Sequence, residues 1–152
     1  MAGYSGKPLV KKLGIREGTK LFLVNAPKKY LKLVSPLPEG LKVMSRIADG
    51  TDVVHIFSTK EVHLTKTLRA FLPRLKQDGM IWISWPKKSA KVPTDITEDT
   101  IRKVALPLGL VDIKVCAVND VWSGLKLVIR KEYRKTKDPI MPSTGRAKAA
   151  RR

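Results

Sequence analysis

The stretch DVVHIFS, residues 52–58, decides the fold of this chain of 152 residues. Four of its seven residues are apolar and they fall on both faces of an extended chain, which is typical of a strand buried on both faces of a sheet. Two further runs have the same character, KLFLVN at residues 20–25 and MIWISW at residues 80–85. Three such strands predict a parallel sheet that is covered on both faces by helices.

The segments between these strands carry helical patterns. Residues 60–77 predict an amphipathic helix that ends at Gly79, with Pro73 expected to kink or tighten its last turn. A second helix is expected between its N-cap Thr97 and Gly109. Shorter helices are expected over residues 3–14 and after Pro27. The apolar stripe of the longest helix consists of Leu64, Leu68, Phe71, Leu72 and Leu75.

Three weaker strands complete the sheet. Residues 41–47 alternate between apolar and basic, as expected of a half-buried outer strand. Residues 110–118 and 125–131 are joined by a segment long enough for an antiparallel hairpin and too short for a parallel crossover. We therefore predict a three-layer Rossmann-like α/β fold, with a mostly parallel sheet of about six strands and a C-terminal antiparallel hairpin.

Charge divides the chain into two parts. Residues 1–133 are expected to form one Rossmann-like domain, and residues 134–152 a basic tail that is too polar to fold. Lys and Arg number 31 against 13 Asp and Glu, a net charge of +18. This excess predicts an anionic partner, or serves solubility alone. The tail could contact nucleic acid or another polyanion, or could be solubilising. Its basic residues are Arg134, Lys135, Lys137, Arg146, Lys148, Arg151 and Arg152.

The composition also excludes several classes of protein. No apolar run approaches the roughly 20 residues that span a bilayer, and residues 1–12 lack the apolar core of a secretory signal. The single cysteine, Cys116, rules out an internal disulfide framework, and with two histidines it makes a zinc site implausible. We therefore expect a cytoplasmic protein with no membrane partner and no metal.

Three groups of residues carry a more specific likeness. They are GYSGKPL at residues 3–9 with KLGI at residues 12–15, WPKK at residues 85–88 with Thr94 and Asp95, and VCAV at residues 115–118 followed by WSGLK at residues 122–126. Together they resemble the bacterial family DUF3052, a domain of unknown function, over about residues 3–133. The resemblance implies a Rossmann-like fold and no established activity. The order of elements is itself similar to a shortened methyltransferase-like fold.

Open α/β sheets bind ligands outside the carboxyl ends of their strands, and polar and aromatic residues gather there in this sequence. We expect a site for an anionic or phosphorylated ligand at that edge, with the alternative that the tryptophans complete the core and the lysines are solvated. The candidate ligand-binding residues are Asn25, Lys28, Lys29, Ser58, Trp85, Lys87, Lys88, Asp120, Trp122 and Ser123.

The usual nucleotide motifs are missing. Asn25, Ala26 and Pro27 follow the first strand where a cofactor-binding fold would place a glycine-rich turn. We therefore predict no cofactor and no catalytic residue. His55 and Cys116 are expected in the core, and His63 at the surface.

These observations favour a bacterial protein that is a non-enzymatic binding or regulatory module rather than an enzyme. Its partner would be a phosphorylated metabolite, a nucleotide or nucleic acid. The alternative is a methyltransferase-like enzyme with an atypical cofactor site. A third possibility is an assembly partner that uses residues 41–47 as an edge for strand pairing.

Overall fold

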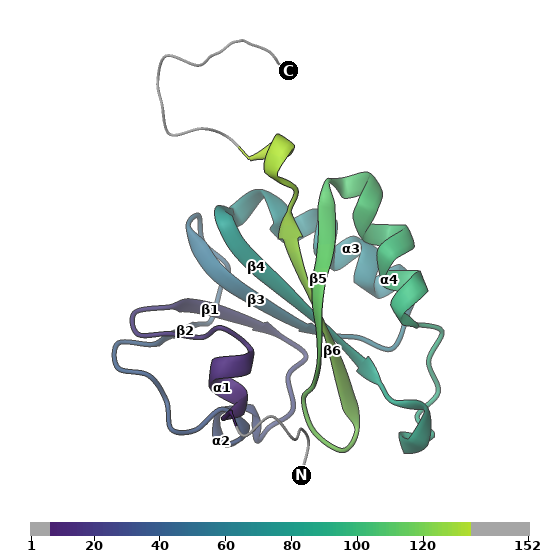
Figure 1. The fold of residues 1–152 in the computed structure, drawn as a ribbon, viewed down its shortest axis with the longest axis horizontal. Helices are drawn as coiled ribbons and strands as arrows, with labels where there is room; N and C mark the ends of the chain where they lie inside the picture. The colour runs from purple at the N-terminus through teal and green to yellow at the C-terminus, as the bar shows by residue number, and fades with distance from the viewer. Residues whose placement is uncertain (1–6, 135–152) are drawn as a thin grey trace.

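Six strands form one sheet in the order β2-β1-β3-β4-β6-β5 in the computed structural model, which describes residues 7–134 (Figure 1). Neighbouring strands are parallel from β2 through β1 and β3 to β4, whereas β6 is antiparallel to both β4 and β5. The predicted mostly parallel sheet with a C-terminal hairpin is confirmed. The strands are β1 (Lys20–Val24), β2 (Lys42–Met44), β3 (Thr51–Phe57), β4 (Leu75–Pro86), β5 (Leu110–Ala117) and β6 (Trp122–Ile129).

Helices cover the two faces unequally. The helices are α1 (Leu9–Lys12), α2 (Tyr30–Leu33), α3 (Glu61–Phe71) and α4 (Glu98–Ala105). Figure 1 shows α3 and α4 on one side of the sheet and α1 and α2 on the other. The first pair buries the larger apolar cluster against the sheet, and the second pair is only one turn per helix. The third layer is therefore present but thin.

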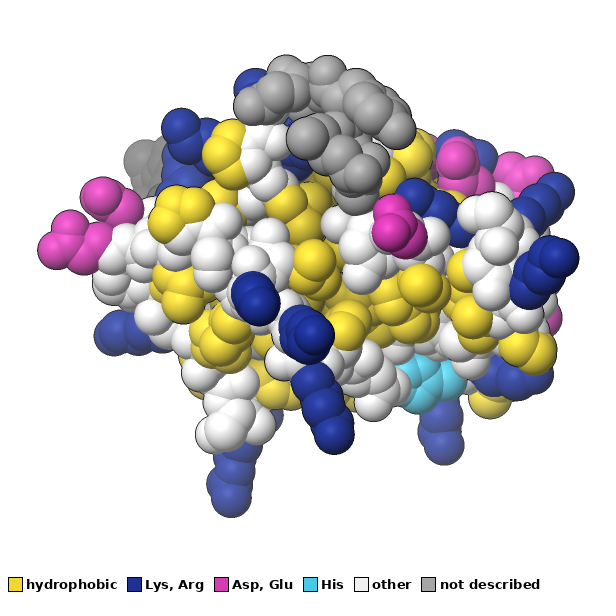
Figure 2. All heavy atoms as spheres, turned by 90° about the horizontal axis from the view of Figure 1, so that it is seen from below, with side chains coloured by type: hydrophobic (Ala, Val, Ile, Leu, Met, Phe, Trp, Pro, Cys, Tyr) yellow, Lys and Arg dark blue, Asp and Glu magenta, His cyan; other side chains and the backbone are white. Residues whose placement is uncertain are grey.

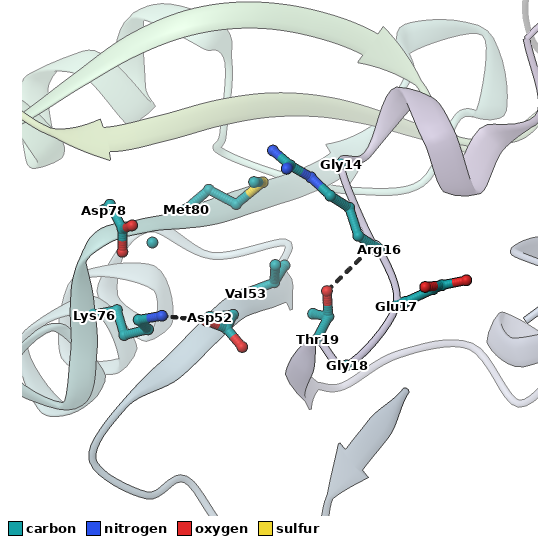
Figure 3. Close-up of a pocket in the computed structure, with 11 residues that line it drawn as sticks. Gly14, Arg16, Glu17, Gly18, Thr19, Asp52, Val53, Lys76, Asp78 and Met80 are labelled. Atoms are coloured by element: carbon teal, nitrogen blue, oxygen red, sulfur yellow. Dashed lines mark hydrogen bonds and ion pairs between the residues drawn. The ribbon is translucent and has the colours of Figure 1, made fainter. Parts of the chain in front are cut away.

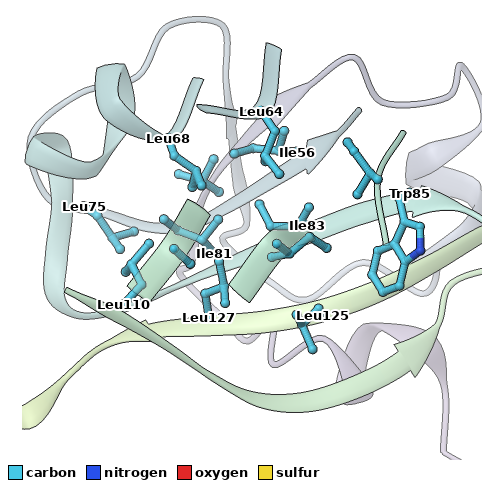
Figure 4. Packing of buried hydrophobic residues seen from close by; sticks show 14 of the residues in the cluster. Ile56, Leu64, Leu68, Leu75, Ile81, Ile83, Trp85, Leu110, Leu125 and Leu127 are labelled. Atoms are coloured by element: carbon cyan, nitrogen blue, oxygen red, sulfur yellow. The ribbon is translucent and has the colours of Figure 1, made fainter. Parts of the chain in front are cut away.

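The larger cluster forms the main core (Figure 4). Leu64 and Leu68 of α3 pack against Ile56 of β3 and against Ile81 and Ile83 of β4. These five side chains are at most 1% exposed. The helical spacing of the apolar residues in the sequence therefore identifies the face that α3 buries.

The helix predicted over residues 60–77 is shorter in the structure. It ends at Phe71, and Leu72–Arg74 form a 3-10 turn that contains Pro73. Proline lacks the N–H that the α-helical hydrogen bond needs, so it ends the helix there. The residues that follow belong to β4, and Gly79 lies inside this strand rather than at a helix end.

The outer strands are less buried than the sequence suggests. Residues 20–25 were expected to be buried on both faces, but within β1 only Leu21 is fully buried. β2 has three residues, of which Lys42 and Val43 are exposed. The one-turn helices on this side cannot cover two strands, which explains the difference. β3 is buried as expected, apart from the partly exposed Asp52.

Two further findings limit what the fold contains. Over residues 7–134, no helix has the length and apolar character needed to cross a membrane. The same residues include no cluster of three or more His, Cys, Asp or Glu side chains suited to a metal ion. The predicted basic tail lies outside the described residues apart from Arg134, whose Nε donates a hydrogen bond of 2.8 Å to the carbonyl of Ile129.

Candidate functional site

A hollow of about 290 Å³ opens at the carboxyl ends of β1 and β3. Asn25 follows β1 directly and has a φ of 55°, a left-handed conformation that turns the chain away from the sheet. Ser58 follows β3, and Trp122 begins β6. Thus three of the predicted ligand-binding residues meet at one place. The hollow is lined by Asn25, Phe57, Ser58, Thr59, Lys60, His63 and Trp122.

A hydrogen-bonded pair of Ser58 and His63 lies at the centre of this hollow. Ser58 Oγ is 2.8 Å from His63 Nδ1, and it donates to the carbonyl of Lys60 at 3.1 Å. The amide Nδ2 of Asn25 lies 3.3 Å from His63 Nε2. His63 comes from the first turn of α3, so strand ends and a helix start hold one polar group together.

These contacts suit His63 with its hydrogen on Nδ1. A serine hydroxyl has one hydrogen, and when Ser58 uses it on the Lys60 carbonyl, Ser58 Oγ can accept from His63 Nδ1–H. In that tautomer Nε2 carries no hydrogen, and the Asn25 amide can donate to it. Thr67 Oγ1 also lies 3.4 Å from Nε2. An Nε2 without a hydrogen is the form a proton acceptor requires.

Aromatic side chains form the other wall of the hollow. Phe57 and Trp122 pack edge to face, with ring centroids 5.1 Å apart. Trp122 pairs with Pro86 across the antiparallel ladder, which ties this wall to the end of β4. The site therefore combines an apolar surface with a hydrogen-bonding group, as small-molecule sites commonly do.

A second polar group is buried beneath this hollow. His55 is fully buried, with Nδ1 2.8 Å from the hydroxyl of Tyr30 and Nε2 2.8 Å from Ser84 Oγ. Burial lowers the pKa of His55 to about 3, because the protonated ring would lose its hydration. Burial also raises the pKa of Cys116, whose side chain lies in the core. Both residues are structural, as their sequence settings indicate.

The remaining predicted ligand-binding residues divide between a second hollow and the surface. Trp85, Lys87, Lys88 and Ser123 line a hollow of about 500 Å³ beside the start of α4. The backbone N–H of Lys87 donates to the carbonyl of Val121 at 2.7 Å, so this loop adjoins the hairpin that carries Trp122. Lys28, Lys29 and Asp120 are exposed and line neither hollow.

His63 is the functional candidate that the sequence prediction placed at the surface and left out of the site. It is partly buried in the hollow, six residues beyond the end of β3 in the first turn of a helix. A helix that follows a parallel strand begins at the carboxyl edge, so its first turn shares that edge with the strand ends. This topological signal could have identified His63.

The opposite edge of the sheet holds another polar hollow, of about 360 Å³ (Figure 3). It lies at the amino ends of β1 and β3, against the turn from Gly14 to Thr19. Lys76 and Asp52 form an ion pair of 3.3 Å there. None of the predicted ligand-binding residues lies in it.

In folds of this kind, a nucleotide-type cofactor binds at the turn after β1 and beside the end of β2. In this chain Asn25, Ala26 and Pro27 form the turn after β1, where glycines would let a ligand approach the backbone. The helix after that turn, α2, has four residues, and Ser45 and Arg46 stand after β2 in place of an acid that could bind a ribose. The residues present do not fit the usual cofactor cradle of such folds.

Comparison with known sequences gives one family. The family model "Protein of unknown function (DUF3052)" matches residues 42–131, which is more than half of the chain. Comparison with curated proteins gives no match. The family that the resemblance names is therefore confirmed over residues 42–131, and the motif group at residues 3–15 lies outside the matched span.

Several solved structures with a similar fold are described as methyltransferases or as complexes with S-adenosylmethionine (SAM). A SAM dependent methyltransferase from Aquifex aeolicus aligns over 80% of this chain and 87% of its own, with a TM-score of 0.57 and 15% identity. Fibrillarin from Aeropyrum pernix, with natively bound S-adenosyl-L-methionine, aligns over 84% of this chain and 71% of its own. Its TM-score is 0.53 and its sequence identity 14%. Magnesium protoporphyrin IX methyltransferase from Synechocystis PCC 6803, with bound SAM, aligns over 80% of this chain and 76% of its own. Its TM-score is 0.52 and its sequence identity 10%. At these identities the likeness shows a Rossmann-like fold.

The comparisons correct the functional prediction. A non-enzymatic binding or regulatory module was favoured because the first loop lacks glycine, and the chain was ranked as more probably not an enzyme. That ranking is wrong: the similar solved structures are described as methyltransferases or as holding SAM, and their shared fold favours the methyltransferase-like alternative. The error came from weighing one loop above the order of the whole sheet.

Proposed function

The chain belongs to the DUF3052 family of proteins of unknown function, and we propose that it is a methyltransferase-like enzyme with an atypical cofactor site. The reacting groups lie at the carboxyl edge of β1, β3 and β4. The fold of the methyltransferases named above supports this placement, although the site itself is built from different residues.

One observation carries the proposal, the cluster of Asn25, Ser58 and His63. Three chain segments that are distant in sequence bring hydrogen-bonding side chains into a hollow at the edge where open α/β sheets bind ligands. Ser58 keeps the hydrogen of His63 on Nδ1, at 2.8 Å. Polar side chains that would only stabilise the fold need not gather in a hollow that is open to ligands.

The chemistry available to the chain's own residues is acid–base. His63 Nε2 can accept a proton from a hydroxyl or amine that displaces the amide of Asn25, now 3.3 Å away. The Ser58 hydroxyl and the Lys60 carbonyl then hold the Nδ1–H side of the ring in place. Phe57 and Trp122 exclude water from one side of the hollow and give a flat ligand a surface to pack on.

The neighbouring hollow suits the substrate to be modified. Trp85, Lys87, Lys88 and Ser123 line it, and the contact of Lys87 with Val121 places it beside the hairpin that carries Trp122. Two lysines at its rim favour a substrate with negative charge. The sequence-based expectation of an anionic ligand thus becomes part of the enzyme proposal.

The test is a set of melting curves with S-adenosylmethionine and with S-adenosylhomocysteine. A ligand that binds only the folded protein stabilises it, by about 2.7 kcal/mol at 100 times its dissociation constant. We expect a raised melting midpoint for the full chain, and a smaller rise for Trp122→Ala and for Asn25→Ala. Glu17→Gln, at the opposite edge of the sheet, is the matched control and should respond like the parent protein.

Two results would count against the proposal. If neither ligand stabilises the protein at millimolar concentration, the protein does not use S-adenosylmethionine as a cofactor. If the melting midpoint rises by the same amount in Trp122→Ala and Asn25→Ala as in the parent protein, the cofactor binds elsewhere than at this edge.

A further inference from the structure

Four cations lie together on the α1 side of the sheet: Lys12, Arg16, Lys114 and Lys126. We name them the hairpin cation cluster. Lys114 of β5 and Lys126 of β6 are register partners and stand directly opposite each other in the antiparallel ladder. Like charges in this position repel each other and destabilise a sheet. This pair is therefore an arrangement that needs an explanation.

The other two members come from α1 and the turn behind it. Figure 3 shows the Arg16 side chain extending from this turn over the hollow, towards Met80. The charges of Arg16 and Lys114 both act on Lys126, and those of Lys12 and Lys114 both act on Cys116. Cys116 lies two residues beyond Lys114 on β5. The four cations therefore surround one short part of the hairpin.

Within residues 7–134, no carboxylate of the chain neutralises these four cations. None of the four cations takes part in an ion pair in that part of the chain. Asp112, the carboxylate closest in sequence to Lys114, is held by Arg102 at 3.0 Å. Asp52 is held by Lys76 at 3.3 Å, so it is also engaged.

The surroundings strengthen the mutual repulsion. Lys126 is partly buried and pairs in register with Trp82, which is fully buried. Burial is the largest cause that lowers the pKa of Lys126, and the nearby charges of Lys114 and Arg16 lower it further. Of the four cations, Arg16 alone lines the hollow of about 360 Å³ at the opposite edge of the sheet. Lysine and arginine side chains are prominent on the surface in Figure 2.

We propose that the hairpin cation cluster is a binding site for a phosphate group, distinct from the hollow at the carboxyl edge. A multiply charged phosphate placed between Arg16, Lys114 and Lys126 would turn the repulsion into attraction. Arginine offers it paired N–H donors, and lysine offers a compact charge. The proposal is independent of the methyltransferase-like function, because it uses no residue of that site.

The test uses the full chain and a double variant, Lys114→Gln with Lys126→Gln. Without a ligand, in low salt, the variant should melt about 1–4 °C higher than the parent protein, since the repulsion is gone. Pyrophosphate should raise the melting midpoint of the parent several-fold more than that of the variant. Lys32→Gln with Lys66→Gln, which removes the same charge at two exposed positions, is the matched control and should keep the pyrophosphate response.

Two further arms complete the test. Lys114→Arg with Lys126→Arg keeps the charges and should retain the response, which separates charge from packing. A short single-stranded oligonucleotide replaces pyrophosphate in the second arm. If only the oligonucleotide gives a response that depends on the two lysines, the phosphate belongs to a nucleic acid backbone. If neither ligand distinguishes the Gln double variant from its control, the proposal is wrong.

Discussion

At the residue scale, His55 and His63 show how position decides what one side chain can do. His55 is fully buried and both its ring nitrogens have partners inside the protein. His63 lies in a hollow with Nε2 reachable by a ligand. The first histidine links Tyr30 and Ser84 across the core, and the second can take up a proton from a substrate.

His55 should make the fold sensitive to acid. Its folded pKa of about 3 lies below the usual value of 6.5, so between these values only the unfolded chain binds the proton. The stabilisation is complete above pH 6.5 and is lost as the pH falls, by about 1.4 kcal/mol per unit. Urea unfolding between pH 7 and pH 4 measures it. His55→Gln should flatten this slope relative to the parent, and an unchanged slope would contradict the assignment.

His63 offers a direct test of the assigned tautomer. Ser58 accepts from Nδ1–H, so nitrogen chemical shifts of the imidazole should show the hydrogen on Nδ1 in the parent protein. Ser58→Ala removes that acceptor and should shift the population towards the Nε2–H form. A ring that carries its hydrogen on Nε2 in the parent protein would contradict the assignment.

Sequence reasoning at this scale pointed to some residues of the candidate site and missed others for a physical reason. Asn25 and Ser58 were identified because strand ends are visible in the sequence. His63 was missed because its role depends on where a helix starts relative to the sheet edge. Lys28 and Lys29 were included because they follow a strand, but the turn at Asn25 leaves them exposed and outside both hollows.

At the element scale, the start of α4 was predicted accurately because its cap is encoded locally. Thr97 Oγ1 accepts from the backbone N–H of Thr100 at 3.2 Å, and Thr100 Oγ1 accepts from the N–H of Thr97 at 3.1 Å. Thr97→Ala should lower the free energy of unfolding by about 1 kcal/mol, because the N–H of Thr100 loses its acceptor. Thr65→Ala, inside α3, is the control and should change it by less than half as much in denaturant titrations.

The junction of α3 and β4 was predicted poorly because it depends on long-range packing. Residues 75–77 continue the helical pattern, yet Pro73 ends the helix and β4 begins at Leu75. Gly79 then packs so closely on β3 that an added Cβ would lie 2.9 Å from the carbonyl oxygen of Asp52. No local pattern announces a contact between strands.

The sheet therefore leaves no room for a side chain at Gly79. Gly79→Ala should cost about 1–3 kcal/mol of stability, since the backbone oxygen of Asp52 is held within a paired strand. The exposed neighbour Asp78 provides the control, and Asp78→Ala should stay within about 0.5 kcal/mol of the parent. Equal stability of the two variants would show that β3 and β4 can separate at this point.

At the scale of the whole molecule, the order of strands is the most informative feature. Buried runs separated by helical patterns predicted the parallel sheet, and a short connection predicted the hairpin. The insertion of β6 between β4 and β5 could not be predicted, because the partner of a strand depends on the closure of the whole sheet. That arrangement brings Trp122 beside Phe57 and so completes the candidate site.

The most direct test of the central claim is a backbone amide NMR titration of the full chain with S-adenosylhomocysteine. We expect the largest shift changes at Asn25, Ser58, His63 and Trp122, at the carboxyl edge of the sheet. The turn from Gly14 to Thr19 at the opposite edge should stay unchanged. Shift changes confined to that opposite turn, or no shift changes at all, would contradict the account.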